Sequence, residues 1–302
     1  MRIAIIGAGA IGGYYGGLLS EVADVTFIVR GATLEALRSR GLRIDDDRGS
    51  RVLAVQATDR PADVGIADVV IVTTKSRDLR AALAAALPLV GPQTIVMPVQ
   101  NGVEAPYVVA EFVAEQAVVP CIVRGFLEHV APAHVAYHGG PRSFTFNSWG
   151  NQPSATVQAT ASAIRTAGFE AVVAEDVWVE LWEKAMFVVS FGALGALTEQ
   201  PLGVLRSALR EQLTETISEI AAVARVRGVP LTADAVARTL QFVDAMPEDA
   251  TTSMQRDIMD GNASELDAQT GGIIRLARKS AVDTPRLDLM HAVLSLRPGQ
   301  AL

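Results

Sequence analysis

The sequence is poor in the residues that form disulfides and metal sites. It has one cysteine, Cys121, and four histidines among 302 residues. A single cysteine excludes an intramolecular disulfide, and these few side chains show no spacing typical of metal ligands. Because Cys121 lies in the apolar run 118–123, we interpret it as a buried strand residue rather than a reactive thiol.

The chain also lacks a basic excess. Its formal net charge is −7, with 26 Lys and Arg against 33 Asp and Glu. Nucleic-acid surfaces normally carry clustered positive charge, so no nucleic-acid partner is expected. Hydrophobic residues make up 50% of the chain and charged residues 20%, which is a globular composition. The length is sufficient for two domains, each with its own core.

Long uninterrupted apolar runs are missing. The longest one after the N-terminal region, residues 185–197, has 13 residues and contains Ser190, so it is too short to span a bilayer. The N-terminal apolar stretch is broken by six glycines and does not resemble a signal peptide. We therefore expect a soluble cytoplasmic protein with no membrane partner.

The glycines of the N-terminal region form a motif. The apolar run 2–6 is followed by Gly-x-Gly-x-x-Gly and, further on, by a second apolar run, 25–29. This spacing predicts a strand, a turn, a helix and a strand. Gly7 would permit the tight turn, Gly9 would let backbone amides approach a pyrophosphate, and Gly12 would allow close helix packing. The unpaired N–H groups at the helix N-terminus favour phosphate binding. The predicted cofactor-binding residues of this turn are Gly7, Ala8, Gly9, Ala10, Ile11 and Gly12.

Arg30 directly follows the second apolar run. Folds that prefer NAD usually carry Asp or Glu at this point, which hydrogen-bonds the ribose hydroxyls. A guanidinium instead can pair with a 2′-phosphate through two hydrogen bonds. We therefore predict that the cofactor is NADPH, with a solvated strand-end arginine as the alternative.

The order of elements predicts two domains. Strands and helices alternate in residues 1–175, which indicates a mostly parallel, doubly covered Rossmann-type sheet that ends in an antiparallel portion. Residues 176–302 are dominated by long helices, so the fold class is an α/β domain followed by an all-α domain. The cleft between two such domains is a common ligand site. Strands are expected at 2–6, 25–29, 69–73, 94–98, 118–123, 135–138, 144–147 and 169–174. Helices are expected at 33–40, 77–87, 154–166, 177–197, 208–227, 233–245, 254–259, 267–280 and 285–296.

Several polar residues stand at positions suited to chemistry. Lys184 enters the small, apolar stretch 185–197, where its side chain either extends to water or points into a cleft. Lys75 and Asn101 follow predicted strands, and strand C-termini in such sheets face the ligand crevice. Ser253 and Glu265 could be an ordinary helix N-cap and a first-turn carboxylate.

Together these features resemble the ketopantoate reductase family (ApbA/PanE type). The resemblance extends over nearly the whole chain and rests on the order and spacing of its motifs. These are the glycine turn, Arg30, Lys75, Gln100-Asn101-Gly102, Trp182-x-Lys184, the Glu219 helix that ends at Gly228, Ser253-Met254-x-x-Asp257 and Glu265-x-Asp267.

The resemblance implies NADPH-dependent reduction of a 2-keto acid or related ketone. It makes Lys184 the general acid and Glu265 a catalytic residue that positions substrate, cofactor and lysine. Asn101 would lie near both nicotinamide and substrate, Ser253 would contact the substrate carboxylate, and Lys75 would bind the cofactor. An ammonium can stabilise and protonate the oxygen that becomes negative when hydride reaches a carbonyl carbon.

The sequence departs from the family pattern at two positions. Members that use ketopantoate carry asparagines four and eight residues after the lysine, where this chain has Val188 and Gly192. We predict that both are substrate-binding positions, that Gly192 leaves space, and that the substrate is bulkier or more apolar than ketopantoate. Arg124, His129 and His138 could supply a replacement anchor, although solvated or structural roles are favoured for them.

Two alternatives remain. The chain could be an authentic ketopantoate reductase of pantothenate synthesis, or a non-catalytic NADPH-binding sensor. A pure sensor would need neither Lys184 nor Glu265, which speaks against the second alternative. Substrate identity, reaction direction and oligomeric state, including a homodimer, are left open by the sequence.

Overall fold

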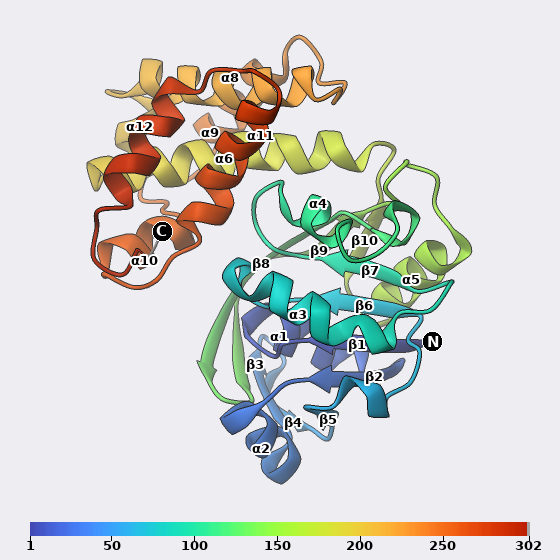
Figure 1. Cartoon of the computed structure of the whole chain (residues 1–302). Coiled ribbons are helices and arrows are strands. Elements are labelled where there is room, and N and C mark those ends of the chain that lie inside the picture. Colours follow the sequence, from blue (N-terminus) through green and yellow to red (C-terminus); the bar gives the residue numbers. More distant parts are fainter. Residues whose placement is uncertain (301–302) are drawn as a thin grey trace. The chain divides into compact units, whose positions relative to one another are not determined.

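The computed structural model describes residues 1–300 and consists of two compact units (Figure 1). The first unit contains residues 1–100 and 105–177. The second contains residues 101–104 together with the chain from Trp178 onward. The short segment 101–104 thus packs with the helices, although the residues on both sides of it belong to the α/β unit.

The first unit contains two five-stranded sheets. The first sheet is entirely parallel, in the order β5-β2-β1-β6-β7. In the second sheet, β10-β9-β3-β4 are neighbours and β8 pairs with β9. The strands are β1 (Arg2–Ile6), β2 (Asp24–Ile28), β3 (Leu42–Asp46), β4 (Gly49–Leu53), β5 (Gln56–Thr58), β6 (Val69–Val72), β7 (Ile95–Pro98), β8 (Cys121–Ala131), β9 (His134–Phe146) and β10 (Glu170–Val173).

The helices of the first unit are short, and those of the second include the longest in the chain. The first unit has α1 (Ala10–Leu19), α2 (Gly31–Arg40), α3 (Leu79–Ala86), α4 (Ala105–Val109) and α5 (Ala155–Thr166). The second has α6 (Val177–Thr198, whose first residue still packs with the first unit), α7 (Leu202–Arg206), α8 (Arg210–Val226), α9 (Ala235–Asp244), α10 (Ser253–Met259), the π-helix Asp267–Gly271, α11 (Gly272–Lys279) and α12 (Pro285–Leu294).

Helix α1 is packed between the two sheets, and its glycines permit this. A Cβ on Gly16 would lie 2.9 Å from the Phe27 ring of the first sheet. A Cβ on Gly13 or Gly17 would lie 2.7 Å from side chains of the second sheet. Side chains of both sheets and of α1 accordingly share one buried core. The other face of the first sheet is covered by a second core that includes α3 and α4.

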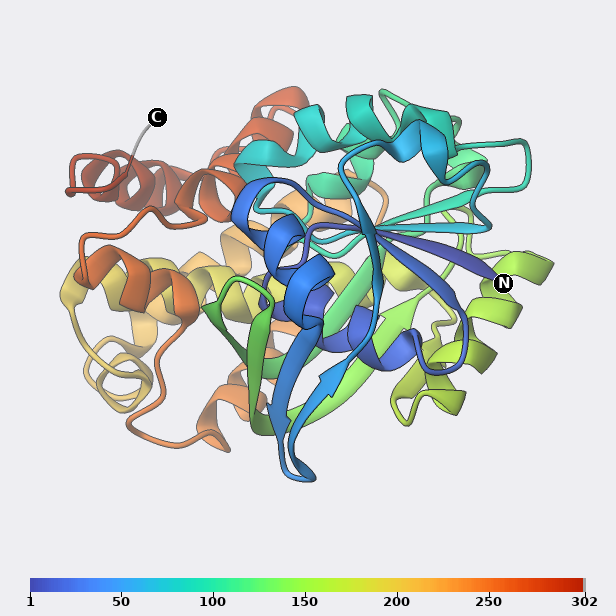
Figure 2. The same cartoon turned by 90° about the horizontal axis from the view of Figure 1, so that it is seen from below.

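The expectation of a single sheet with an antiparallel end is wrong. The strands after β7 belong to the separate second sheet, in which β3 pairs with β9 (Figure 2). The physical reason is the apolar character of α1, since a helix that is apolar all round must be covered on more than one side. The predicted strands 135–138 and 144–147 are parts of one strand, β9. Cys121 is a buried strand residue, as predicted.

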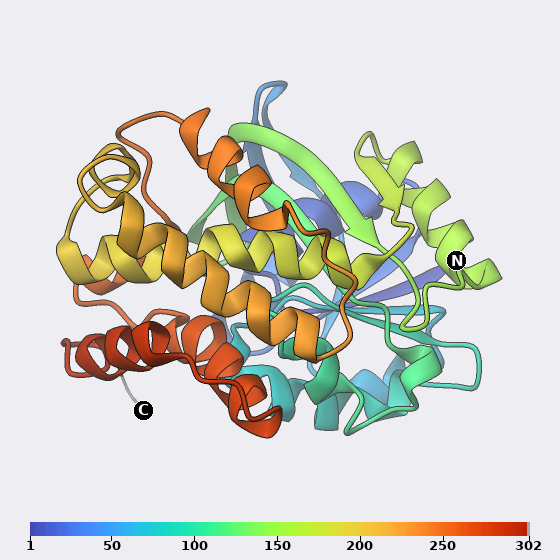
Figure 3. The ribbon, with the colours of Figure 1, turned by 90° about the horizontal axis from the view of Figure 1, so that it is seen from above.

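The second unit is helical, and Figure 3 shows its long helix α6 in yellow. Within residues 1–300, α6 is the one helix long and apolar enough to cross a membrane, but 67% of its most apolar window is buried inside the protein. Such burial is typical of a core helix. Helix α8 ends as predicted, because Gly228 follows it with a φ of 83°, a conformation that favours glycine.

A carboxylate from α8 caps the N-terminus of α12. The two oxygens of Glu219 accept hydrogen bonds from the backbone N–H groups of Arg286 and Leu287, at 3.0 and 3.1 Å. Burial raises the pKa of Glu219, while these two hydrogen bonds lower it. Glu219 therefore satisfies N–H groups that no helical carbonyl can reach.

We expect Glu219→Ala to reduce the free energy of unfolding by about 1–3 kcal/mol, because it leaves two helix N–H groups without their acceptor. Urea denaturation followed by circular dichroism measures this change. Glu211→Ala, on the same helix and exposed, is the matched control and should have little effect. Equal stability of the Glu219→Ala and Glu211→Ala variants would contradict the capping role.

Candidate functional site

The glycine turn lies at the C-terminal end of β1, in the first unit. Gly7 has a φ of 100°, and its N–H donates to the carbonyl of Ile28 at 3.0 Å. A Cβ on Gly12 would overlap the Gly7 carbonyl and the Thr73 hydroxyl, so only glycine fits there. A Cβ on Gly9 would meet nothing within 4 Å. Gly7 and Gly12 thus have the conformational roles predicted from the sequence, and the space at Gly9 is open.

The neighbouring strand ends are held together by side chains. The Thr73 hydroxyl donates to the Ile6 carbonyl at 3.0 Å. The Gln100 amide donates to the carbonyls of Val72 and Thr74, at 3.0 and 2.9 Å. The Thr74 hydroxyl and the Gln100 carbonyl oxygen are two of several buried polar atoms in residues 1–300 that have no hydrogen-bond partner. Such unpaired polar atoms beside an open glycine turn fit a polar ligand like a dinucleotide.

The two predicted cofactor-binding cations of the first unit are both exposed. Arg30 follows β2 as the N-cap residue of α2, and Lys75 follows β6. Within the described part of the chain, neither side chain forms an ion pair or a side-chain hydrogen bond. The positive end of the α2 dipole adjoins Arg30, which favours an anion at this position.

The second unit brings together Lys184, Asn101 and Glu265. The Lys184 ammonium donates to the Asn101 carbonyl oxygen at 3.0 Å, and the Asn101 amide donates to Glu265 Oε2 at 3.4 Å. All three side chains are half-buried. We call this set the lysine cluster. It forms although Asn101 precedes Glu265 by 164 residues.

Neighbouring residues on α6 hold the helix in place around the lysine. Trp182 is completely buried. Glu183 pairs with Arg238 of α9, and burial raises the pKa of this carboxyl. Because its neighbours are anchored on two sides, the helix presents Lys184 in a defined direction. Its ammonium is held by an amide oxygen rather than extending freely into water.

The predicted space at Gly192 does not exist. Gly192 is buried, and a Cβ there would lie 2.8 Å from the Met254 methyl group and 2.9 Å from the Thr252 hydroxyl. A glycine at this position therefore lets the start of α10 approach α6. Val188, one turn closer to Lys184, is half-buried.

Ser253 is exposed and is the first residue of α10. The N-cap is Thr252, whose hydroxyl accepts from the Gln255 N–H at 3.0 Å, so the capping interpretation of Ser253 is wrong.

The three candidate replacement anchors lie on strands β8 and β9 of the first unit. Arg124 donates to the Thr145 hydroxyl at 3.0 Å. His138 is exposed and lies 2.7 Å from a Glu128 oxygen, and His129 is exposed.

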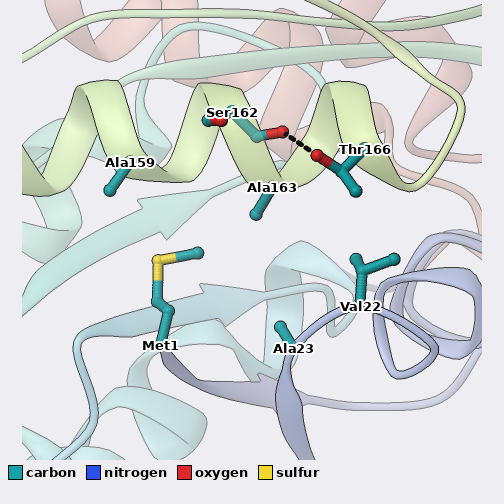
Figure 4. Close-up of a pocket in the computed structure, with 7 residues that line it drawn as sticks. All are labelled: Met1, Val22, Ala23, Ala159, Ser162, Ala163 and Thr166. Atoms are coloured by element: carbon teal, nitrogen blue, oxygen red, sulfur yellow. Dashed lines mark hydrogen bonds between the residues drawn. The ribbon is translucent and has the colours of Figure 1, made fainter.

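A shallow hollow of about 300 Å³ lies on the first unit (Figure 4). None of the predicted site residues lines it. Its walls are mostly small or apolar side chains, and the hydrogen bond drawn there, from the Thr166 hydroxyl to the Ser162 carbonyl at 2.9 Å, is internal to α5. No side chain that lines it is suited to acid–base chemistry. The residues that line it are Met1, Val22, Ala23, Ala159, Ser162, Ala163 and Thr166.

A parallel sheet with an open glycine turn, followed by a helical unit, is typical of NAD(P)H-dependent oxidoreductases. Residues 3–151 match the family model described as "Ketopantoate reductase PanE/ApbA", and residues 176–297 match the model for its C-terminal part. The chain belongs to the ketopantoate reductase family and is an oxidoreductase.

Individual relatives extend over the same length. A 2-dehydropantoate 2-reductase of Mesorhizobium japonicum is 30% identical, with 97% of each chain covered. The crystal structure of a PanE/ApbA family ketopantoate reductase from Ralstonia eutropha has a TM-score of 0.86 and 29% identity, with 98% of each chain covered. A D-mandelate dehydrogenase with NADH and anilino(oxo)acetate has a TM-score of 0.85, with 97% of each chain covered. At 21% identity it shows the common fold.

Proposed function

We propose that this chain is an NADPH-dependent reductase of 2-keto acids in which Lys184 is the general acid. The observation that supports this most is the lysine cluster, in which an ammonium is held by an amide that also contacts a carboxylate. NADPH, when bound, supplies the hydride. The residues that would hold it are Gly7, Ala8, Gly9, Ala10, Ile11, Gly12, Arg30, Lys75 and Asn101.

The residues of the lysine cluster have separate roles in this proposal. The Lys184 ammonium stabilises the negative charge that develops on the substrate oxygen and then donates a proton from Nζ to it. The Asn101 carbonyl orients the ammonium, and its amide group is itself held by Glu265. Glu265 accepts from that amide at 3.4 Å and so positions Asn101 and, through it, the lysine. Ser253, which is exposed, is proposed to hydrogen-bond the substrate carboxylate.

The substrate class is proposed from Val188. Its half-buried side chain lies one helical turn from Lys184 and offers no hydrogen bond. A hydroxyl such as that of ketopantoate would lose water there without gaining a partner. A branched or aromatic side chain would gain by burial, at about 25 cal/mol per Å² of apolar area. Gly192 is proposed to shape the substrate site by letting Thr252 and Met254 pack against α6, not by leaving open space.

We expect kcat/KM for branched and aromatic 2-keto acids to exceed that for ketopantoate. The measurement is NADPH oxidation at 340 nm with 2-ketoisovalerate, 2-ketoisocaproate, phenylglyoxylate and ketopantoate. Val188→Asn should raise kcat/KM for ketopantoate relative to the others, since one hydrogen bond contributes about 0.5–1.5 kcal/mol. Val188→Leu is the matched control, because leucine has nearly the shape and size of asparagine but adds no hydrogen-bonding group.

A wide preference of the unmutated protein for ketopantoate would instead support an authentic ketopantoate reductase, the activity named for the Mesorhizobium japonicum relative. Tight NADPH binding without turnover of any keto acid would support the sensor alternative.

A further inference from the structure

The segment that carries Asn101 is seated against the π-helix of the second unit. Gly102 has a φ of 93°, and a Cβ there would lie 2.7 Å from the carbonyl oxygen of Ala268, within the π-helix. This close approach is open only to glycine. Residues 101–104 therefore run along the helical turn that begins just after Glu265.

One guanidinium joins the two segments. Arg275 of α11 donates to both oxygens of Glu104, from Nε at 2.9 Å and from Nη2 at 2.7 Å. Its Nη1 donates to Asp267 Oδ1 at 2.7 Å. The Glu104 side chain is 21% exposed. The hydrogen bonds that Arg275 donates to Glu104, and to a lesser degree to Asp267, raise the pKa of Arg275 although burial lowers it, so the guanidinium stays charged.

Both carboxylates that Arg275 contacts lie close in sequence to residues of the lysine cluster. Glu104 is three residues from Asn101, and Asp267 is two residues from Glu265. Arg275 thus ties together the segments that carry Asn101 and Glu265, two of the three residues of the lysine cluster. The pairing with Glu104 connects residues 171 positions apart. A two-pronged guanidinium contact of this kind fixes direction as well as distance.

We propose that Arg275, with Glu104 and Asp267, is a positioning device that holds Asn101 and Glu265 in register with Lys184. This inference rests on the proposed function of Lys184. None of the three residues is required to touch substrate or cofactor. Loosening the Glu104 contact would let Asn101 shift and leave the ammonium misdirected at the moment of proton transfer. A misplacement of about 1 Å in such an arrangement can lower a rate by about 10²-fold.

Arg275→Lys tests the geometry, because lysine keeps the charge but cannot make the forked contact. We expect kcat to fall by about 10- to 100-fold, with kcat affected more than KM. The dissociation constant for NADPH should change much less, because of the residues proposed to hold it only Asn101 lies on the segment that Arg275 contacts. Glu104→Gln removes one charge of the pair at constant size and should give the same pattern. Arg278→Lys is the matched control: it lies on the same helix, and its exposed ion pair with Asp288, at 2.8 Å, is remote in sequence from Asn101.

A double variant, Arg275→Lys with Asn101→Ala, shows whether Arg275 affects kcat by positioning Asn101 or only by stabilising the fold. If Arg275 acts through Asn101, Arg275→Lys should lower kcat little further in an Asn101→Ala background. If the two substitutions instead lower kcat by factors that multiply in the double variant, they act independently and the proposal is overturned. An unchanged kcat in folded Arg275→Lys and Glu104→Gln proteins would also overturn it. Should Arg275→Lys fail to fold, Glu104→Gln alone decides. Lys184→Ala distinguishes failure of the proposed function from failure of the positioning role. Full activity of the Lys184→Ala variant refutes the proposed function. Loss of activity in Lys184→Ala together with a normal kcat of Glu104→Gln refutes only the positioning role.

Discussion

Replacing Lys184 with alanine is expected to lower kcat by about 10²-fold or more, the usual scale for loss of an acid–base catalyst. In the proposed mechanism, the variant loses both the proton donor and the positive charge that would stabilise the developing oxyanion. Binding of NADPH should remain, because the predicted cofactor residues of the glycine turn lie on other elements. Steady-state kinetics at saturating keto acid and a fluorescence titration with NADPH measure the two quantities.

Lys279→Ala is the matched control for this experiment. Lys279 is an exposed lysine in the last turn of α11, so its removal changes the net charge equally without touching the lysine cluster. Its kcat should equal that of the unmutated protein. An unchanged kcat for Lys184→Ala would mean that the ammonium has only a structural contact with Asn101.

Arg30→Ala is expected to weaken the binding of NADPH by roughly 10- to 100-fold, the equivalent of losing about 1.5–3 kcal/mol of charged hydrogen bonding. The guanidinium is exposed at the start of α2, where it can pair with a 2′-phosphate through two hydrogen bonds. Binding of NADH should barely change, since that cofactor lacks the phosphate. Isothermal titration with both cofactors provides the measurement.

Arg48→Ala, in the exposed turn between β3 and β4, controls for the loss of one positive charge. Its affinity for NADPH should be normal. Equal dissociation constants of NADPH and NADH in the unmutated protein would remove the basis for the proposed cofactor preference.

Local sequence patterns account for much of the first sheet. The runs that form β1, β2, β6 and β7 consist mainly of apolar residues because these strands are covered on both faces. The glycine turn is equally local, since Gly7 needs a left-handed backbone whatever surrounds it. These elements could be predicted because burial and backbone conformation act residue by residue.

The second sheet was harder to predict. Its strand β4 (Gly49–Leu53) is short and has no fully buried residue, so it lacks a strong pattern, and the same is true of β5 at the edge of the first sheet. The parallel pairing of β3 with β9 joins residues about 90 positions apart, and nothing in either strand specifies its partner. The bonds that unite these strands are between backbone groups, which every residue carries.

The sequence by itself determined the glycine turn and the chain order of an α/β unit and a helical unit, and its resemblance to the ketopantoate reductase family gave Lys184, Asn101 and Glu265 as candidate site residues. Only the tertiary structure decided that Asn101 lies between the other two, that Arg275 ties their segments together, and that the space beside Gly192 is filled by Thr252 and Met254. The physical reason is the sequence separation of the interacting residues. Turns and amphipathic patterns depend on neighbours along the chain, whereas an ion pair across 171 residues or the volume beside a glycine exists only after packing.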